Sequence, residues 1–223
     1  MKKNIYILIP VYNESEVLKD IINDIKREGY EKIIVVDDGS TDETYEIAKK
    51  QKIIVLRHLI NRGKGAAIKT GFEAAKILAA DIVVTIDGDG QHSPKDIKKM
   101  IKNIDKGYDV VLGSRQFKIN SMPLVKIIYN YIADLFTWII YGSWVYDSQS
   151  GFRAYSKKAI SLINTKNDRY EYESEVIKEI SWHKLKSVNV PIDVFYTKYS
   201  GLKKNKQSLY NGIGTAFKLM VHS

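Results

Sequence analysis

The chain has 223 residues, no cysteine and a formal net charge of +9 at pH 7. The length suits one α/β domain with a sizeable buried core, and the lack of cysteine excludes both a disulfide framework and a thiolate metal site. The charge favours an anionic partner, such as nucleic acid, a membrane surface or a phosphorylated substrate, and does not choose among them.

The first half of the chain alternates strand and helix patterns. Short apolar runs predict strands at residues 4–9, 32–36, 52–56, 81–86 and 109–112, and the helical patterns between them cover about 14–27, 42–50, 65–79 and 94–105. The first run is too short for a signal peptide and breaks at Pro10. This alternation predicts βαβ units and a mostly parallel sheet.

Beyond residue 115 the pattern changes. The sequence predicts a long apolar helix at about 122–141, a short strand near 152–155, a helix near 172–182, an extended segment at 187–195 and a basic loop at 203–207 before a last helix. No stretch of the sequence is apolar and long enough to predict a membrane span with confidence. With no repeat or Pro-rich linker, we expect a single domain.

The most informative segment is an apolar run that ends in Asp87-Gly88-Asp89-Gly90-Gln91-His92. Two carboxylates at this spacing repel each other unless a cation lies beside them, and ligands bind where strands end in an open α/β sheet. Hard divalent ions prefer such oxygen ligands and often complete their shell with substrate phosphates. A β-turn explains the same residues, so Asp-Gly-Asp alone leaves both interpretations open.

Three further polar turns follow predicted strands and should lie on the same edge of the sheet. They read Pro10-Val11-Tyr12-Asn13-Glu14, Asp37-Asp38-Gly39-Ser40-Thr41-Asp42 and Asn61-Arg62-Gly63-Lys64-Gly65. Tyr12, Glu14 and Asp38 could hold a nucleobase. Gly-Lys-Gly at a helix start offers N–H groups and an ammonium to an anion, although a solvated lysine explains it too. Ser40 and Asp42 are interpreted as N-cap residues, and His58 and His183 as surface or packing residues.

Together these segments resemble the family 2 glycosyltransferases with a GT-A fold, especially the dolichyl-phosphate mannose synthases and polyprenyl-phosphate glycosyltransferases. Gly113-Ser114-Arg115 and Asp147-Ser148-Gln149-Ser150-Gly151-Phe152-Arg153 also match, so the resemblance spans residues 9–153 in the family's order. It implies an α/β fold with a GT-A-type, mostly parallel sheet flanked by helices and a Rossmann-like nucleotide-binding half. Residues 1–223 would form one such domain, with a nucleotide-sugar half at about 1–115 and an acceptor- and membrane-facing half at about 116–223.

The resemblance also implies residue roles. The donor would be bound by Pro10, Tyr12, Glu14, Val36, Asp38, Lys64, Asp87, Gly88 and Asp89. Mg²⁺ or Mn²⁺ would be bound by Asp87, Asp89 and Gln91, and the acceptor by Ser150, Arg153 and Lys198. Catalysis would depend on Asp89, Arg115 and Arg153. The reaction would move a sugar, with inversion, from GDP-mannose or a UDP-hexose to polyprenyl or dolichyl phosphate. Tyr146 and Lys198 stand where the mannose synthases carry arginine, which leaves both donors open.

Two other functions fit the sequence less well. A sugar-1-phosphate nucleotidyltransferase would carry a glycine-rich basic loop after the first strand, where this chain has Val11-Tyr12-Asn13-Glu14. A basic nucleic-acid-binding adaptor explains only the charge and has no need of Asp87 and Asp89. The expected partners are therefore a nucleotide sugar, a polyprenyl phosphate and a membrane surface, but not nucleic acid.

The apolar segment at 122–144 carries a polar stripe of Lys126, Asn130 and Asp134, which is typical of an interfacial helix and also of a helix packed on the sheet. Lysines at 203, 204 and 206 favour the membrane interpretation. We therefore expect a peripheral protein on the cytoplasmic face of a membrane.

Overall fold

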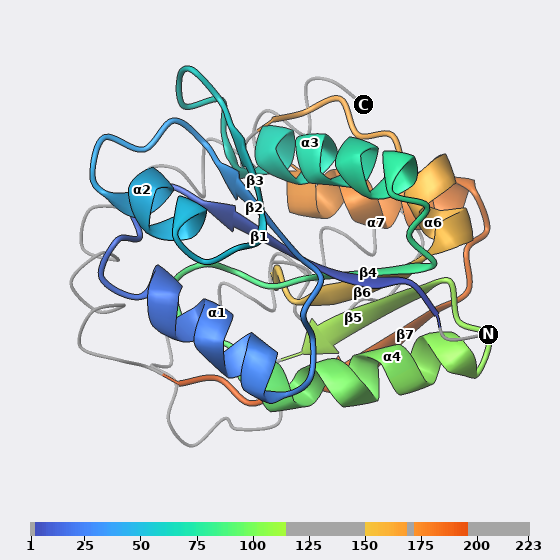
Figure 1. Ribbon diagram of the computed structural model, residues 1–223. Coiled ribbons are helices and arrows are strands. Elements are labelled where there is room, and N and C mark those ends of the chain that lie inside the picture. Colours follow the sequence, from blue (N-terminus) through green and yellow to red (C-terminus); the bar gives the residue numbers. More distant parts are fainter. Residues whose placement is uncertain (1–2, 115–149, 169–171, 196–223) are drawn as a thin grey trace, which may run out of the picture.

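The computed structural model describes residues 3–114, 150–168 and 172–195 (Figure 1). In this part of the chain a seven-stranded sheet has the order β3-β2-β1-β4-β6-β5-β7. The strands are β1 Ile5–Val11, β2 Ile33–Asp37, β3 Ile54–Arg57, β4 Ile82–Thr85, β5 Val110–Ser114, β6 Arg153–Ser156 and β7 Ser187–Pro191. The helices are α1 Leu18–Arg27, α2 Thr44–Lys49, α3 Lys64–Ile77, a 3₁₀ turn η1 Pro94–Asp96, α4 Ile97–Asp105, α6 Lys157–Leu162 and α7 Tyr172–Trp182.

The sheet is mostly parallel, with one reversed strand. β1 pairs in parallel with β2 and β4, β2 with β3, and β5 with β7, whereas β6 is antiparallel to both of its neighbours, β4 and β5. Every described strand except β6 therefore ends at the same edge of the sheet, which we call the carboxyl edge. This confirms the expected α/β fold class.

Helices cover both faces of the sheet. Because side chains alternate along a strand, Leu8 and Ile34 pack with α3, α6 and α7 on one face, while Ile7 and Val35 pack with α1 and α4 on the other. Figure 1 shows these two helical layers on opposite sides of the strands. Strands buried on both faces are continuously apolar, which explains the unbroken apolar runs in the sequence.

Most predicted elements are confirmed within a few residues, with two differences. α1 begins at Leu18 rather than near residue 14, because the carbonyl of Glu14 accepts bonds from the Val17 and Leu18 amides in a turn that precedes the helix. Helix α6 was not predicted, because six residues are too few to show a helical period. The helix predicted at 122–141, the basic loop at 203–207 and the last helix lie outside the described residues. None of the described helices is long and apolar enough to cross a membrane.

Candidate functional site

The turns that follow β1 and β2 are joined to each other at the carboxyl edge. The Asn13 amide donates to Ser40 Oγ at 2.9 Å, and Asn13 Oδ1 accepts from the Thr41 amide at 2.8 Å. Asn13 has φ 55°, a left-handed conformation that asparagine tolerates better than most residues. Ser40 and Asp42 are not at the N-cap position predicted for them, because Glu43 occupies that position in α2. Ser40 instead accepts a bond from Asn13 in the turn after β1. Asp42 Oδ1 does accept a bond from the Thr44 amide at 3.0 Å.

Asp38 fixes the loop between β3 and α3. Its Oδ1 accepts from the Arg62 amide at 3.0 Å and lies 2.7 Å from His58 Nδ1, and its Oδ2 accepts from the Gly63 amide at 2.7 Å. His58 Nε2 lies 2.9 Å from Thr70 Oγ1. Of the two roles expected from the sequence, surface or packing, His58 therefore has the packing role: its buried ring links Asp38 to α3. This loop delivers Lys64 as the first residue of α3.

A charge cluster of partly exposed and buried side chains forms where α3, α7 and the end of β4 meet. Lys64 Nζ lies 2.7 Å from Asp87 Oδ1 and 3.0 Å from Glu173 Oε1, and Asp87 Oδ2 lies 3.2 Å from His92 Nε2. The sequence analysis did not single out Glu173, which comes more than eighty residues after Asp87 with no spacing that links the two. Its only signal is an acidic residue in the first turn of a predicted helix.

Charge pairing decides the ionisation of this cluster. Burial alone would raise the pKa of Asp87 and lower that of Lys64, but each effect is outweighed by opposite charge. Lys64 and His92 hold the pKa of Asp87 well below its usual range, and Asp87 with Glu173 raises the pKa of Lys64. Asp89 behaves differently, because burial and then the negative charge of Asp87 raise its pKa.

The Asp89 carboxylate is held by Gln91. Asp89 Oδ1 accepts from the Gln91 amide at 3.0 Å, and Oδ2 accepts from Gln91 Nε2 at 2.7 Å. The turn requires a φ of 73° at Gly90, a conformation that glycine adopts readily and residues with a larger side chain disfavour. The sequence-predicted metal residues Asp87, Asp89 and Gln91 therefore lie together.

The donor set of this turn fits a hard divalent cation. Asp87 and Asp89 offer carboxylate oxygens one residue apart just after β4, and hard divalent cations prefer such oxygen ligands. Within residues 3–114, 150–168 and 172–195, no three His, Cys, Asp or Glu side chains form a group that could hold a metal ion.

The segment that enters β6 packs directly against this cluster. A Cβ at Gly151 would overlap Asp87 Oδ1 and Lys64 Nζ, so a larger residue here would displace these two side chains. Arg153 is buried, and its guanidinium donates to the Ser150 carbonyl at 2.9 Å and to the Glu173 carbonyl at 3.4 Å. These bonds tie the β6 entrance to the first turn of α7.

The remaining sequence-predicted donor residues lie on the neighbouring strands. Pro10 and Val36 are paired in register near the ends of β1 and β2, and the half-exposed Tyr12 follows β1. Gly88 packs against Val11, where a Cβ would meet Val11 Cγ1 at 2.6 Å. Arg115 and Lys198 lie outside the described residues.

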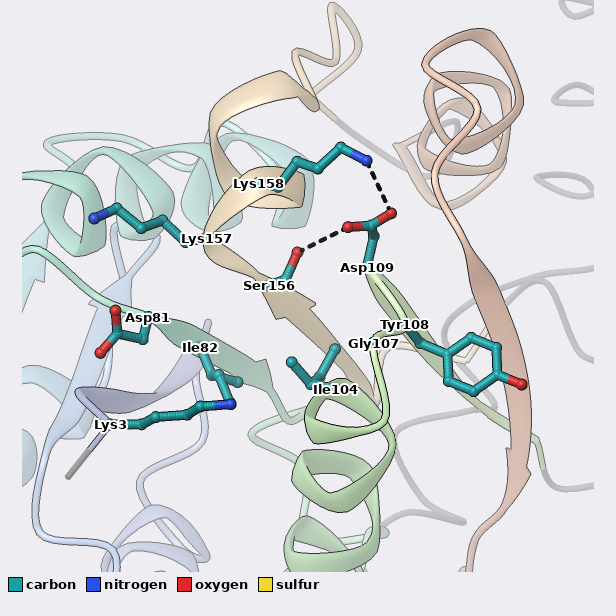
Figure 2. Close-up of a pocket in the computed structure, with 10 residues that line it drawn as sticks. All are labelled: Lys3, Asp81, Ile82, Ile104, Gly107, Tyr108, Asp109, Ser156, Lys157 and Lys158. Atoms are coloured by element: carbon teal, nitrogen blue, oxygen red, sulfur yellow. Dashed lines mark hydrogen bonds and ion pairs between the residues drawn. The ribbon is translucent and has the colours of Figure 1, made fainter. Parts of the chain in front are cut away.

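A pocket of about 500 Å³ lies at the opposite edge of the sheet and includes none of the sequence-predicted site residues (Figure 2). It is lined by Lys3, Asp81, Ile82, Ile104, Gly107, Tyr108, Asp109, Ser156, Lys157 and Lys158. Lys158 is paired with Asp109 at 3.1 Å across it. The candidate site thus depends on the charge cluster at the carboxyl edge and not on this pocket.

A family model and several related proteins match most of this chain. Residues 6–163 match the family model described as glycosyl transferase family 2. The chain is 42% identical to protein MJ1222 of Methanocaldococcus jannaschii, over 99% of this chain and 92% of that protein. It is 40% identical to the UDP-N-acetylglucosamine–dolichyl-phosphate N-acetylglucosaminyltransferase of Methanococcus voltae, over 89% of this chain and 88% of that protein.

A solved structure shares the fold. Glucosyl-3-phosphoglycerate synthase from Mycobacterium tuberculosis superposes with a TM-score of 0.69 and 18% sequence identity, over 96% of this chain and 80% of that one. Identity this low supports the arrangement of strands and helices and nothing finer.

Proposed function

The chain belongs to glycosyl transferase family 2, and from this we propose that it moves a sugar from a nucleoside-diphosphate sugar to the phosphate of a polyprenol or dolichol. The observation that carries the proposal is the turn with Asp87 and Asp89 at the carboxyl edge, beside the ion-paired ammonium of Lys64. Relatives named as dolichyl-phosphate N-acetylglucosaminyltransferase and polyprenol monophosphomannose synthase support this class of acceptor.

On the donor side, Asp87, Asp89 and Gln91 would hold Mg²⁺ or Mn²⁺ on the diphosphate. The ion would neutralise the charge that develops on the departing nucleoside diphosphate. Structures of the fold relative from M. tuberculosis contain Mn²⁺ and UDP. Pro10, Tyr12, Glu14, Val36 and Asp38 would hold the nucleoside, with Lys64 and Gly88 nearer the diphosphate.

On the acceptor side, the attacking group would be a phosphate monoester. Such a group is anionic at neutral pH, so the reaction needs no strong general base. We assign Ser150, Arg153 and Lys198 to the acceptor and Arg115 to phosphate. Because Arg153 also ties Ser150 to the Glu173 carbonyl, its contribution includes placing the segment that packs against Asp87 and Lys64.

We further propose one GT-A domain over residues 1–223, with a donor half at about 1–115 and an acceptor half at about 116–223, working on the cytoplasmic face of a membrane. A UDP-linked N-acetylhexosamine is the first donor to test, because the relative at 40% identity is named for it. GDP-mannose comes next, because a relative at 27% identity is named a mannose synthase.

The test is a panel of UDP-N-acetylglucosamine, UDP-glucose and GDP-mannose with Mn²⁺ or Mg²⁺, read by nucleoside diphosphate release with and without polyprenyl phosphate. Release from one donor that depends on both the acceptor and the metal is the expected result. Pyrophosphate release from a nucleoside triphosphate and a sugar 1-phosphate would instead establish the nucleotidyltransferase alternative.

A further inference from the structure

Large apolar side chains are exposed mainly at the carboxyl edge of the sheet. Among the residues that the structure describes, the exposed large hydrophobic side chains are Tyr12, Leu59, Ile60, Ile77, Trp182 and Phe195. Tyr12 follows β1, Leu59 and Ile60 follow β3, and Phe195 donates its amide to the Gln91 carbonyl beside the Asp89 turn. Ile77 and Trp182 end α3 and α7, which both run away from this edge.

The most exposed pair lies on a loop whose backbone is fixed. Leu59 is 101% exposed and Ile60 is 71% exposed. On either side of them, His58 and the amides of Arg62 and Gly63 bond to the Asp38 carboxylate. Beneath them the chain lies against Gly39, where a Cβ would meet the Ile60 carbonyl carbon at 2.6 Å. The exposure therefore belongs to a held loop, which extends from the end of β3 in Figure 1.

We propose that Leu59 and Ile60 insert into the surface of an anionic lipid bilayer and turn the candidate site toward it. The inference rests on the proposed function, because a long-chain lipid acceptor presents its phosphate at the bilayer surface. A ligand that reaches Asp87 and Lys64 must approach the same edge of the sheet that carries these two side chains.

The chemistry of the edge favours a lipid surface over a protein partner. A stable protein interface buries roughly 800 Å² on each partner, which a tip of two side chains does not offer, whereas a bilayer accepts isolated aliphatic groups. The exposed Phe195 on the same edge is of the type that interfacial segments place toward lipid. The net charge of +9 complements anionic headgroups, and Arg62 beside this tip is half-exposed, with Asp168 at 3.8 Å as its ion-pair partner.

Because the chain has no cysteine, single labelling sites can be introduced directly. Leu59→Cys and Ile60→Cys carry a polarity-sensitive fluorophore, and Ile77→Cys, 86% exposed at the opposite edge, is the matched control. On vesicles of phosphatidylcholine with phosphatidylglycerol, emission at positions 59 and 60 should shift to the blue and that at 77 should not. No shift at 59 and 60, or an equal shift at 77, would overturn the proposal.

The paired variant Leu59→Ser/Ile60→Ser should bind these vesicles roughly tenfold or more weakly, and Ile77→Ser should bind like the parent. Transfer to a short, water-soluble isoprenyl phosphate separates this inference from the proposed function. Transfer in solution without insertion at 59 and 60 overturns the docking surface alone. Insertion without transfer to any isoprenyl phosphate overturns the proposed function and leaves the docking surface standing.

Discussion

Asp87 and Asp89 are one residue apart, yet the protein treats them differently. Asp87 is ion-paired with Lys64 and touches His92. Both oxygens of Asp89 accept hydrogen bonds from the backbone and side-chain amides of Gln91, which are neutral groups and compensate its charge only weakly. The first carboxylate is thus neutralised by the protein itself, and the second retains charge that a divalent ion would balance.

Asp89→Asn should therefore weaken metal-dependent binding of the donor nucleotide by roughly tenfold or more, because a charged oxygen ligand is replaced by a neutral amide. Titration calorimetry with a nucleoside diphosphate, with Mn²⁺ and with a chelator, measures this. Asp20→Asn, on the exposed face of α1, is the matched control and should change neither affinity. Unchanged nucleotide affinity and metal dependence in Asp89→Asn would remove this residue from the metal site.

Lys64→Met should lower the free energy of unfolding by about 1–2 kcal/mol, because it leaves the partly exposed Asp87 and the buried Glu173 as neighbouring carboxylates without their shared cation. Adding Glu173→Gln should restore roughly 1 kcal/mol by removing one of the two charges. Urea unfolding of both variants measures the effect.

The matched control is Lys69→Met on the same helix. Lys69 is as exposed as Lys64, but its partner Asp168 is one-third exposed, whereas Glu173, a partner of Lys64, is buried. The loss of Lys69 should therefore cost less than about 1 kcal/mol. Equal destabilisation by Lys64→Met and Lys69→Met would contradict a special role for the cluster of Lys64, Asp87 and Glu173.

At the scale of elements, the sequence patterns predict what is local and miss what is assembled. Apolar runs and turn residues place β1 to β5 and their helices, because strand and helix periods are local properties. The position of β6 between β4 and β5 is a pairing choice that no local pattern records. The same limit applies to the site, where the turns with Asp38 and Asp87 are predicted but Glu173 and His58 are not, since each acts on a residue distant in sequence.

The loop between β3 and α3 offers a test of such a long-range contact. His58→Leu leaves the Asp38 carboxylate and Thr70 without the imidazole, so the Arg62 and Gly63 amides should exchange with solvent faster and stability should fall by about 1–3 kcal/mol. Hydrogen exchange read at these amides is the measurement. His183→Leu is the control, because His183 is partly exposed and lies 3.5 Å from Glu179. Unaltered exchange in His58→Leu would show that the loop is held without the imidazole.

At the scale of the whole molecule, one edge of the sheet combines buried charge with exposed apolar side chains. The strand ends bring Asp38, Lys64 and Asp87 together, and the same loop that positions Lys64 carries Leu59 and Ile60. A parallel sheet produces this arrangement because its strand ends and the loops that follow them share one edge. Binding a soluble donor and facing a lipid surface then become properties of a single face.

The pH dependence of overall stability should distinguish the carboxylates of Asp42 and Asp89, because folding shifts their pKa values in opposite directions. Burial acts to raise the pKa of Asp42, but bonds from Thr44 and Ser15 lower it overall, so Asp42 contributes stability above pH 4 or so that is lost on acidification. The pKa of Asp89 is raised by burial and by Asp87, so the folded state binds its proton more tightly than the unfolded state does. Between the two pKa values of Asp89, stability therefore falls as the pH rises.

Asp42→Asn should accordingly flatten the rise of unfolding free energy with pH near and below pH 4. Asp89→Asn should steepen this rise above pH 4, because ionisation of Asp89 opposes it there. Urea unfolding with a chelator present, repeated across the acid range, measures both slopes. The effect of Asp42→Asn should stay below about 1 kcal/mol because that side chain is largely exposed to solvent. Slopes that change in the same direction in both variants would contradict the opposite environments assigned to these carboxylates.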